Sequence, residues 1–127
     1  MTERAHRSLP VWKASIDLIE AFYVLSARLP KEEVFGLQAQ MRRAAVSVAA
    51  NIAEGSARRS TPELIQFLHV ANGSLSELDT HLEIVKRLRY QDDVAGIQTL
   101  GQRPGTADGG HPVIEAAEPL KSFVICH

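Results

Sequence analysis

The sequence contains a single cysteine, and this scarcity restricts its chemistry. Cys126 has no partner for an intrachain disulfide, and one thiolate cannot build a sulfur-based metal cluster. No run of apolar residues reaches the roughly 18 residues that a membrane span requires. The first ten residues also lack the apolar stretch of a secretory signal. We therefore expect a cytoplasmic protein that has no membrane partner.

Net charge is nearly absent as well. The chain has 14 Lys and Arg residues against 15 Asp and Glu residues, a formal net charge of -1. The molecule as a whole therefore does not attract nucleic acid or an anionic membrane, and any such binding requires a local basic patch. With 127 residues, of which 45% are hydrophobic and 23% charged, the chain has the size and composition of one globular domain.

Apolar residues recur with the period of an α-helix in three stretches, at about residues 10–29, 36–54 and 61–89. Pro10 suits the first turn of the first helix, and Pro30 should end that helix because it lacks an amide donor. Each helix has one apolar face that must be buried against a neighbour. The pattern predicts antiparallel packing of the three helices.

Residues at the helix ends carry more local signals. Gly55 stands where a left-handed C-terminal cap of the second helix is expected. Ser60 and Glu63 form a capping box at the start of the third helix. Inside that helix, Gly73 predicts close packing against a neighbour, because a helical glycine is otherwise destabilising.

A fourth helix begins at about residues 93–100 and then stops, since residues 101–127 are rich in glycine and proline and have no helical period. We expect residues 1–100 to form an all-α, up-down-up-down four-helix bundle domain. Its helix four is truncated or replaced by an irregular, poorly ordered C-terminal tail. The missing cover predicts an exposed groove bordered by four residues of helices one and three: Phe22, Leu68, Leu75 and Leu82.

The stretch GLQAQMRRAAVSVAANIAEG, at residues 36–55, resembles a known family. It is similar to the four-helix-bundle proteins found in intervening sequences of bacterial large-subunit ribosomal RNA genes. These are relatives of the accessory variability determinant of diversity-generating retroelements. The residues that carry the resemblance most specifically are Gln40, Arg42, Arg43, Asn51, Ile52, Ala53, Glu54 and Gly55.

The resemblance implies an up-down-up-down bundle that assembles into a ring-shaped homo-oligomer, usually a pentamer, without catalytic activity. The retroelement relatives bind nucleic acid and a reverse transcriptase through a basic surface. The sequence departs from the family after Leu100. One hypothesis is a single-base frameshift near codon 101, which sequencing of the gene would test, because a GC-rich coding of residues 101–120 can encode a helix-like string one base later.

Basic residues cluster at three places, and exposed guanidinium groups hold phosphates without reading bases. The candidate nucleic-acid-binding residues are Arg42, Arg43, Arg58, Arg59, Lys86 and Arg87. The alternative is that Arg42 pairs with an acidic residue on a neighbouring helix and that the others are solvated. We expect Asn51, Glu54 and Gly55 to form a structural motif, because polar side chains near a helix end commonly satisfy backbone groups.

No pattern indicates catalysis, a cofactor, a metal or a small-molecule substrate. His69 and His81 lie about 18 Å apart along one helix, too far to share a metal, and we expect both at the surface or at caps. Ser47 and Ser74 are expected to bond to a carbonyl one turn back or across the bundle. Two hypotheses remain: an oligomeric, non-enzymatic scaffold that binds RNA, DNA or a nucleoprotein, and a purely structural or protein-binding bundle.

Overall fold

The computed structural model describes residues 4–90, which are entirely helical apart from short links. The α-helices in this range are α1 (Pro10–Ala27), α2 (Leu37–Ser56) and α3 (Thr61–Arg87). Two short 3-10 helices accompany them, η1 (Ala5–Ser8) and η2 (Lys31–Glu33). The all-α class is therefore confirmed. The expected fourth helix at 93–100 and the expected tail at 101–127 lie outside the described residues.

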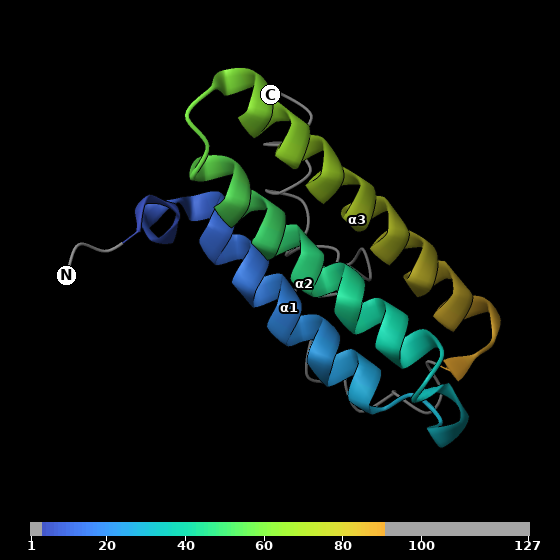
Figure 1. The fold of residues 1–127 in the computed structure, drawn as a ribbon. Helices are drawn as coiled ribbons and strands as arrows, with labels where there is room; N and C mark the ends of the chain where they lie inside the picture. Colours follow the sequence, from blue (N-terminus) through green and yellow to red (C-terminus); the bar gives the residue numbers. More distant parts are fainter. Residues whose placement is uncertain (1–3, 91–127) are drawn as a thin grey trace, which may run out of the picture.

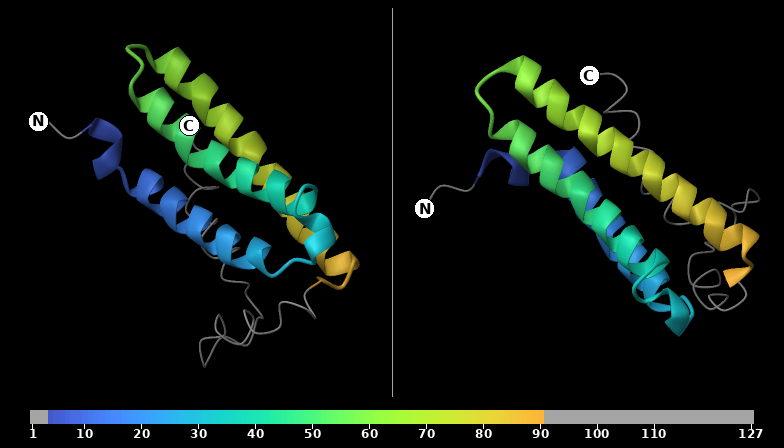
Figure 2. Two further views of the ribbon diagram at one scale, coloured as in Figure 1. Left: turned by 60° about the horizontal axis from the view of Figure 1, so that its bottom comes forward. Right: turned by 45° about the vertical axis from the view of Figure 1, so that its right-hand side comes forward.

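Helix α2 lies between α1 and α3 and packs against both, with neighbouring helices antiparallel (Figure 1). The 3-10 helix η1 packs against α1 and α2, so the start of α1 and the link between α2 and α3 lie at the same end of the molecule (Figure 2). The alternation of direction follows from the short links between long amphipathic helices.

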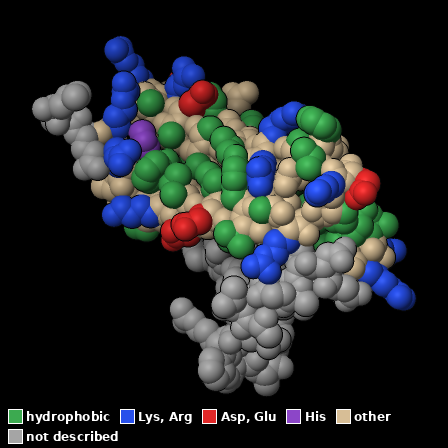
Figure 3. Space-filling model, turned by 90° about the horizontal axis from the view of Figure 1, so that it is seen from below, with side chains coloured by type: hydrophobic (Ala, Val, Ile, Leu, Met, Phe, Trp, Pro, Cys, Tyr) green, Lys and Arg blue, Asp and Glu red, His purple; other side chains and the backbone are tan. Residues whose placement is uncertain are grey.

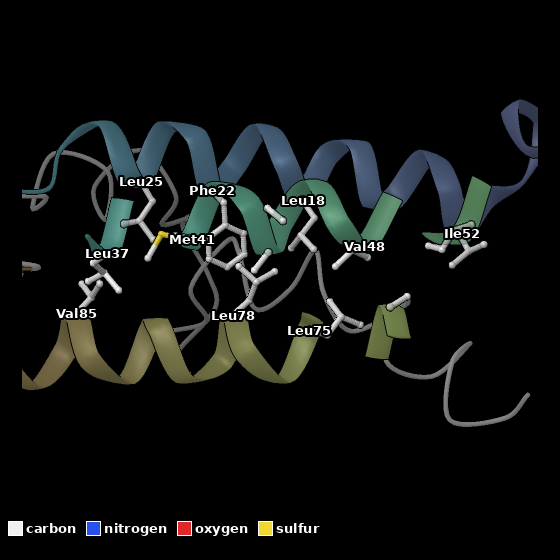
Figure 4. Packing of buried hydrophobic residues seen from close by; sticks show 14 of the residues in the cluster. Leu18, Phe22, Leu25, Leu37, Met41, Val48, Ile52, Leu75, Leu78 and Val85 are labelled. Atoms are coloured by element: carbon white, nitrogen blue, oxygen red, sulfur yellow. The ribbon is translucent and has the colours of Figure 1, made fainter. Parts of the chain in front are cut away.

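The three helices share one core, in which side chains of α1 and α3 meet over the apolar face of α2 (Figure 4). Its residues include Leu18, Phe22, Leu25, Met41, Val48, Ile52, Leu75, Leu78 and Val85. The exposed groove predicted at Phe22, Leu68 and Leu75 is wrong, because all three side chains are buried. Leu82 is partly buried and packs against the same core.

The helix ends agree with the sequence pattern to within about two residues. Helix α1 begins at Pro10 as predicted but ends at Ala27 instead of residue 29. The cap of α3 is confirmed, since the Ser60 hydroxyl accepts a hydrogen bond from the amide of Glu63 at 3.4 Å. Helix α3 ends at Arg87 and not at residue 89, because Arg89 adopts a φ of 60° that is incompatible with a helix.

The role predicted for Gly55 is wrong. Helix α2 continues through Gly55 to Ser56, and Ala57 forms the C-cap. A Cβ atom on Gly55 would lie 2.9 Å from Cβ of Phe67 and 3.1 Å from Cδ1 of Leu64, both on α3. Gly55 therefore permits a close approach of two helices. The close packing predicted at Gly73 is wrong as well, because a Cβ atom there would meet nothing within 4 Å.

Candidate functional site

The six candidate basic residues do not form a single patch. Helix α3 has 27 residues and is therefore about 40 Å long. Arg58 and Arg59 precede its first residue, whereas Lys86 and Arg87 lie in its last turn. Arg42 and Arg43 lie on the middle helix between these two ends. The structure thus divides the candidates into three separate groups.

Arg42 is engaged inside the molecule. Its Nε donates a 2.8 Å hydrogen bond to the hydroxyl of Ser26 on α1, and its guanidinium carbon lies 4.6 Å from the ring centroid of Tyr23. Gln38 reinforces this contact by donating to the carbonyl of Ser26 at 2.8 Å. Because Ser26 is buried, the three side chains fasten α2 to α1. The partners of Arg42 within residues 4–90 are a hydroxyl and an aromatic ring, and no acidic residue of that range is among them.

Arg43 lies on the other flank of α2, because successive helical residues point about 100° apart. It is exposed and lines a recess of about 320 Å³ between α2 and α3. The residues around this recess are Gln40, Arg43, Ala44, Ser47, Ser74 and Glu77. The two arginines that are adjacent in the sequence therefore occupy different sides of the middle helix.

A hydrogen-bonded network closes the floor of this recess. Ser74 on α3 donates to the hydroxyl of Ser47 on α2 at 2.9 Å, a bond across the bundle. Asn51 donates from Nδ2 both to the carbonyl of Ser47 at 2.7 Å and to its hydroxyl at 3.0 Å. Glu54 points elsewhere and lies 3.9 Å from Arg58. The bond between Ser47 and Ser74 therefore joins α2 to α3, and Asn51 supports Ser47 from within α2.

Arg58 and Arg59 lie at the same end of the molecule as basic residues that are distant from them in the sequence. Because η1 packs against α1 and α2, residues 4–13 share one end of the bundle with residues 54–63 (Figure 1). These two segments carry five Lys and Arg residues against two Glu residues. We call this group the η1 end: Arg4, Arg7, Lys13, Arg58 and Arg59. Figure 3 shows Lys and Arg side chains gathered there, at the left of the view.

Two arginines of the η1 end are stacked on aromatic rings. The guanidinium carbon of Arg58 lies 4.9 Å from the ring centroid of Phe67, and that of Arg7 lies 5.3 Å from the centroid of Trp12. His6 also contacts Trp12 edge to face, with centroids 5.1 Å apart. Stacking on a ring restricts the position of a guanidinium group. These contacts hold positive charge at the surface.

The directions of the helices add to the positive electrostatic potential at the η1 end. The N-termini of α1 and α3 lie there, together with the C-terminus of α2. Since each N-terminus carries about half a positive charge, two N-termini against one C-terminus favour anions. No motif in the sequence indicates this, because it depends on how three helices are arranged.

The opposite end carries basic residues too, but their setting differs. Lys86 and Arg87 lie in the last turn of α3, where cations offset the negative end of the helix dipole. Arg87 also donates to Glu83 at 3.0 Å. The segments 28–36 and 83–90 that form this end carry five Lys and Arg residues against three Glu residues, and two helix C-termini lie here against one N-terminus. Lys86 and Arg87 therefore favour the end of α3 electrostatically, whereas the helix termini at the η1 end favour anions.

His81 is not at the surface, which corrects the prediction. The side chain is buried on α3, because its position faces the packed flank of that helix. Burial lowers the pKa of His81 below its ordinary value of 6.5, while Glu77, whose Oε1 lies 3.6 Å from Nε2, opposes this shift. Nδ1 has no hydrogen-bond partner in the part of the chain that the structure describes. Within residues 4–90, no group of three His, Cys, Asp or Glu side chains could hold a metal ion.

The chain matches a known family. The model of the family described as 23S rRNA-intervening sequence protein matches residues 7–102, well over half of the chain, and confirms the resemblance noted in the sequence. The match includes all three α-helices and ends close to the point where the glycine- and proline-rich segment begins. None of the curated proteins compared with the chain matches it. No helix among the described residues is long and apolar enough to cross a membrane.

Proposed function

The chain belongs to the 23S rRNA-intervening sequence protein family, and from this premise we propose that it is a non-catalytic helical scaffold that binds nucleic-acid phosphates through its η1 end. One observation carries the proposal. The packing of η1 against α1 and α2 brings Arg4, Arg7 and Lys13 to the same end as Arg58 and Arg59. Five cations beside two helix N-termini form a local basic patch on a chain whose net charge is only -1.

The chemistry of the η1 end suits the sugar-phosphate backbone and does not suit base edges. Arginine forks bind phosphate oxygens in bidentate fashion, and the stacked positions of Arg7 and Arg58 reduce the side-chain entropy that binding would remove. Backbone contacts of this kind fix position and affinity without reading sequence. The proposed partner is therefore RNA or DNA, alone or within a nucleoprotein, recognised through its backbone phosphates.

Assembly into a homo-oligomer is the second part of the proposal. Large apolar side chains are exposed on α1, namely Ile16, Tyr23 and Val24, and Figure 3 shows hydrophobic side chains along the middle of the face that it presents. Exposed apolar surface of this kind favours association. A ring of subunits would repeat the η1 end, and repeated weak sites raise the overall affinity for a long polyanion.

A purely structural or protein-binding bundle is the competing function. It is favoured by the contact of Arg58 with Glu54 at 3.9 Å, because an arginine already near a carboxylate has less charge to offer. That ion pair is exposed, so solvent screens it and its contribution is small. The two functions differ in their response to salt, since only phosphate binding releases condensed counterions.

The test is binding of the full chain to a structured RNA and to duplex DNA across a salt series. We expect the logarithm of the association constant to fall linearly with the logarithm of salt, with a slope of about 0.9 per phosphate contact on duplex DNA. The double substitution Arg58→Gln with Arg59→Gln should weaken binding and lower that slope by about two contacts. The matched control, Lys86→Gln with Arg87→Gln, should leave both nearly unchanged. No binding at low salt, or equal losses in the two variants, would refute the proposal.

A further inference from the structure

The recess between α2 and α3 has a chemical character distinct from that of the η1 end. Arg43 enters it from α2 and Glu77 from α3, so charges of opposite sign line one hollow of about 320 Å³. The other polar groups are the amide of Gln40 and the hydroxyls of Ser47 and Ser74. Recesses of this volume lie at the small end of ligand sites.

Arg43 and Glu77 both have hydrogen-bonding groups that a ligand could contact. Arg43 makes no hydrogen bond or ion pair with another described residue, and it forms no ion pair with Glu77 although both line the recess. Glu77 has one oxygen, Oε1, 3.6 Å from His81, which leaves Oε2 for another donor. Burial keeps the pKa of His81 low, so this histidine is neutral at pH 7 and does not neutralise the carboxylate.

The floor of the recess adds a directed donor. The hydroxyl of Ser47 accepts from both Asn51 and Ser74, at 3.0 Å and 2.9 Å, which uses its two lone pairs. The proton of that hydroxyl therefore has no acceptor within the network. A ligand oxygen that enters the recess would meet this proton together with the guanidinium group of Arg43.

We propose that the recess binds a small zwitterion, whose carboxylate contacts Arg43 and Ser47 and whose ammonium group contacts Glu77. A volume of about 320 Å³ corresponds to roughly ten water molecules. This size fits a molecule of about ten non-hydrogen atoms or fewer. The six lining residues include no aromatic ring on which a nucleobase would stack. The proposed ligand class is therefore an amino-acid-like molecule with separated charges.

Three probes that share a four-carbon chain test this proposal: 4-aminobutyrate, which carries both charges, butyrate, which carries only the anion, and butylammonium, which carries only the cation. Each is titrated into the full, isotopically labelled chain while the backbone amide resonances of Ser47 and Ser74 are followed. We expect saturable shifts with 4-aminobutyrate and a dissociation constant on the order of 1 mM, because few atoms make contact. Each singly charged probe should bind about tenfold more weakly, since one charged contact is lost.

Variants locate the site. Arg43→Gln and Glu77→Gln should each weaken 4-aminobutyrate binding about tenfold, with the helical content of the chain unchanged because both side chains are exposed. Arg59→Gln, at the η1 end, should leave this binding unchanged. Equal affinity for the three probes, absence of a saturable shift, or insensitivity to Arg43→Gln would each overturn the proposal. Arg43 is not part of the η1 end, so this result does not depend on nucleic-acid binding.

Discussion

Arg42 and Arg43 are neighbours in the sequence, yet they belong to two differently built helix contacts. On the α1 side of α2, Arg42 is held by Ser26 and Tyr23, and its charge serves the packing of two helices. On the α3 side, a hydrogen bond between two serines joins the helices, an asparagine of α2 supports one of these serines, and Arg43 faces a recess. A basic pair on a middle helix is therefore not one functional unit, because adjacent residues reach different neighbours.

The largest effect is expected where α2 and α3 approach each other most closely. Gly55→Val should lower the free energy of unfolding by about 3 kcal/mol, because the new side chain would overlap Phe67 and Leu64 and force the helices apart. Gly73→Val is the matched control, and it should change stability by less than about 0.5 kcal/mol, since that position faces open space. Urea unfolding followed by circular dichroism measures both. Equal losses would show that the contact at Gly55 is not tight.

The next effect separates the two arginines. Arg42→Met should destabilise the fold by about 1.5 kcal/mol, because it removes a charge-assisted hydrogen bond and a stacked cation while it keeps a long side chain. Arg43→Met should change stability by less than about 0.5 kcal/mol, as at most exposed positions. The same unfolding assay compares them. A loss at position 43 as large as that at position 42 would contradict the division described above.

A smaller effect concerns the polar contact between α2 and α3. Ser47→Ala should destabilise the chain by about 1 kcal/mol, because Ser74 and Asn51 each lose an acceptor. In a double-mutant cycle with Ser74→Ala, the double variant should lose less stability than the sum of the two single losses, since both substitutions remove the same bond. Strict additivity would mean that the two hydroxyls do not interact in solution.

The smallest effect is a pH dependence that originates at His81. Burial lowers the pKa of His81 in the folded state, so below pH 6.5 the unfolded chain takes up this proton before the folded chain does. The contribution to stability is therefore fully present above pH 6.5, declines as the pH falls, and levels off below the folded-state pKa. Unfolding at several pH values should show this decline. It should disappear in His81→Gln and persist in His69→Gln, because His69 is exposed.

Much of the fold could be predicted from local patterns. The spacing of apolar residues predicts α1, α2 and α3, and Pro10 and Ser60 mark two of their starts correctly. These signals act within one or two turns of helix, so they need no knowledge of the neighbours. Ser47 and Ser74 were each expected to bond one turn back or across the bundle, and they bond across it to each other.

The wrong predictions concern residues whose role depends on which part of the chain packs against them. Gly55 has the same sequence context whether it caps a helix or admits another one, and only the position of Phe67 distinguishes the two. His81 lies on the flank of the apolar stripe of α3, where the presence or absence of a neighbouring helix decides whether the side chain is buried. The η1 end was missed for the same reason, because Arg7 and Arg58 are far apart along the chain.

The central place of α2 has a consequence for cooperativity. Its buried face contacts both outer helices, and small residues such as Ala44, Ala45 and Ala49 alternate there with larger ones such as Met41 and Ile52, so this helix depends on both neighbours. The outer helices in turn pack mainly against α2. Separate fragments that carry α1 and α3 would therefore not assemble without the middle helix, and amide protons in α2 should exchange with solvent only when the whole bundle opens.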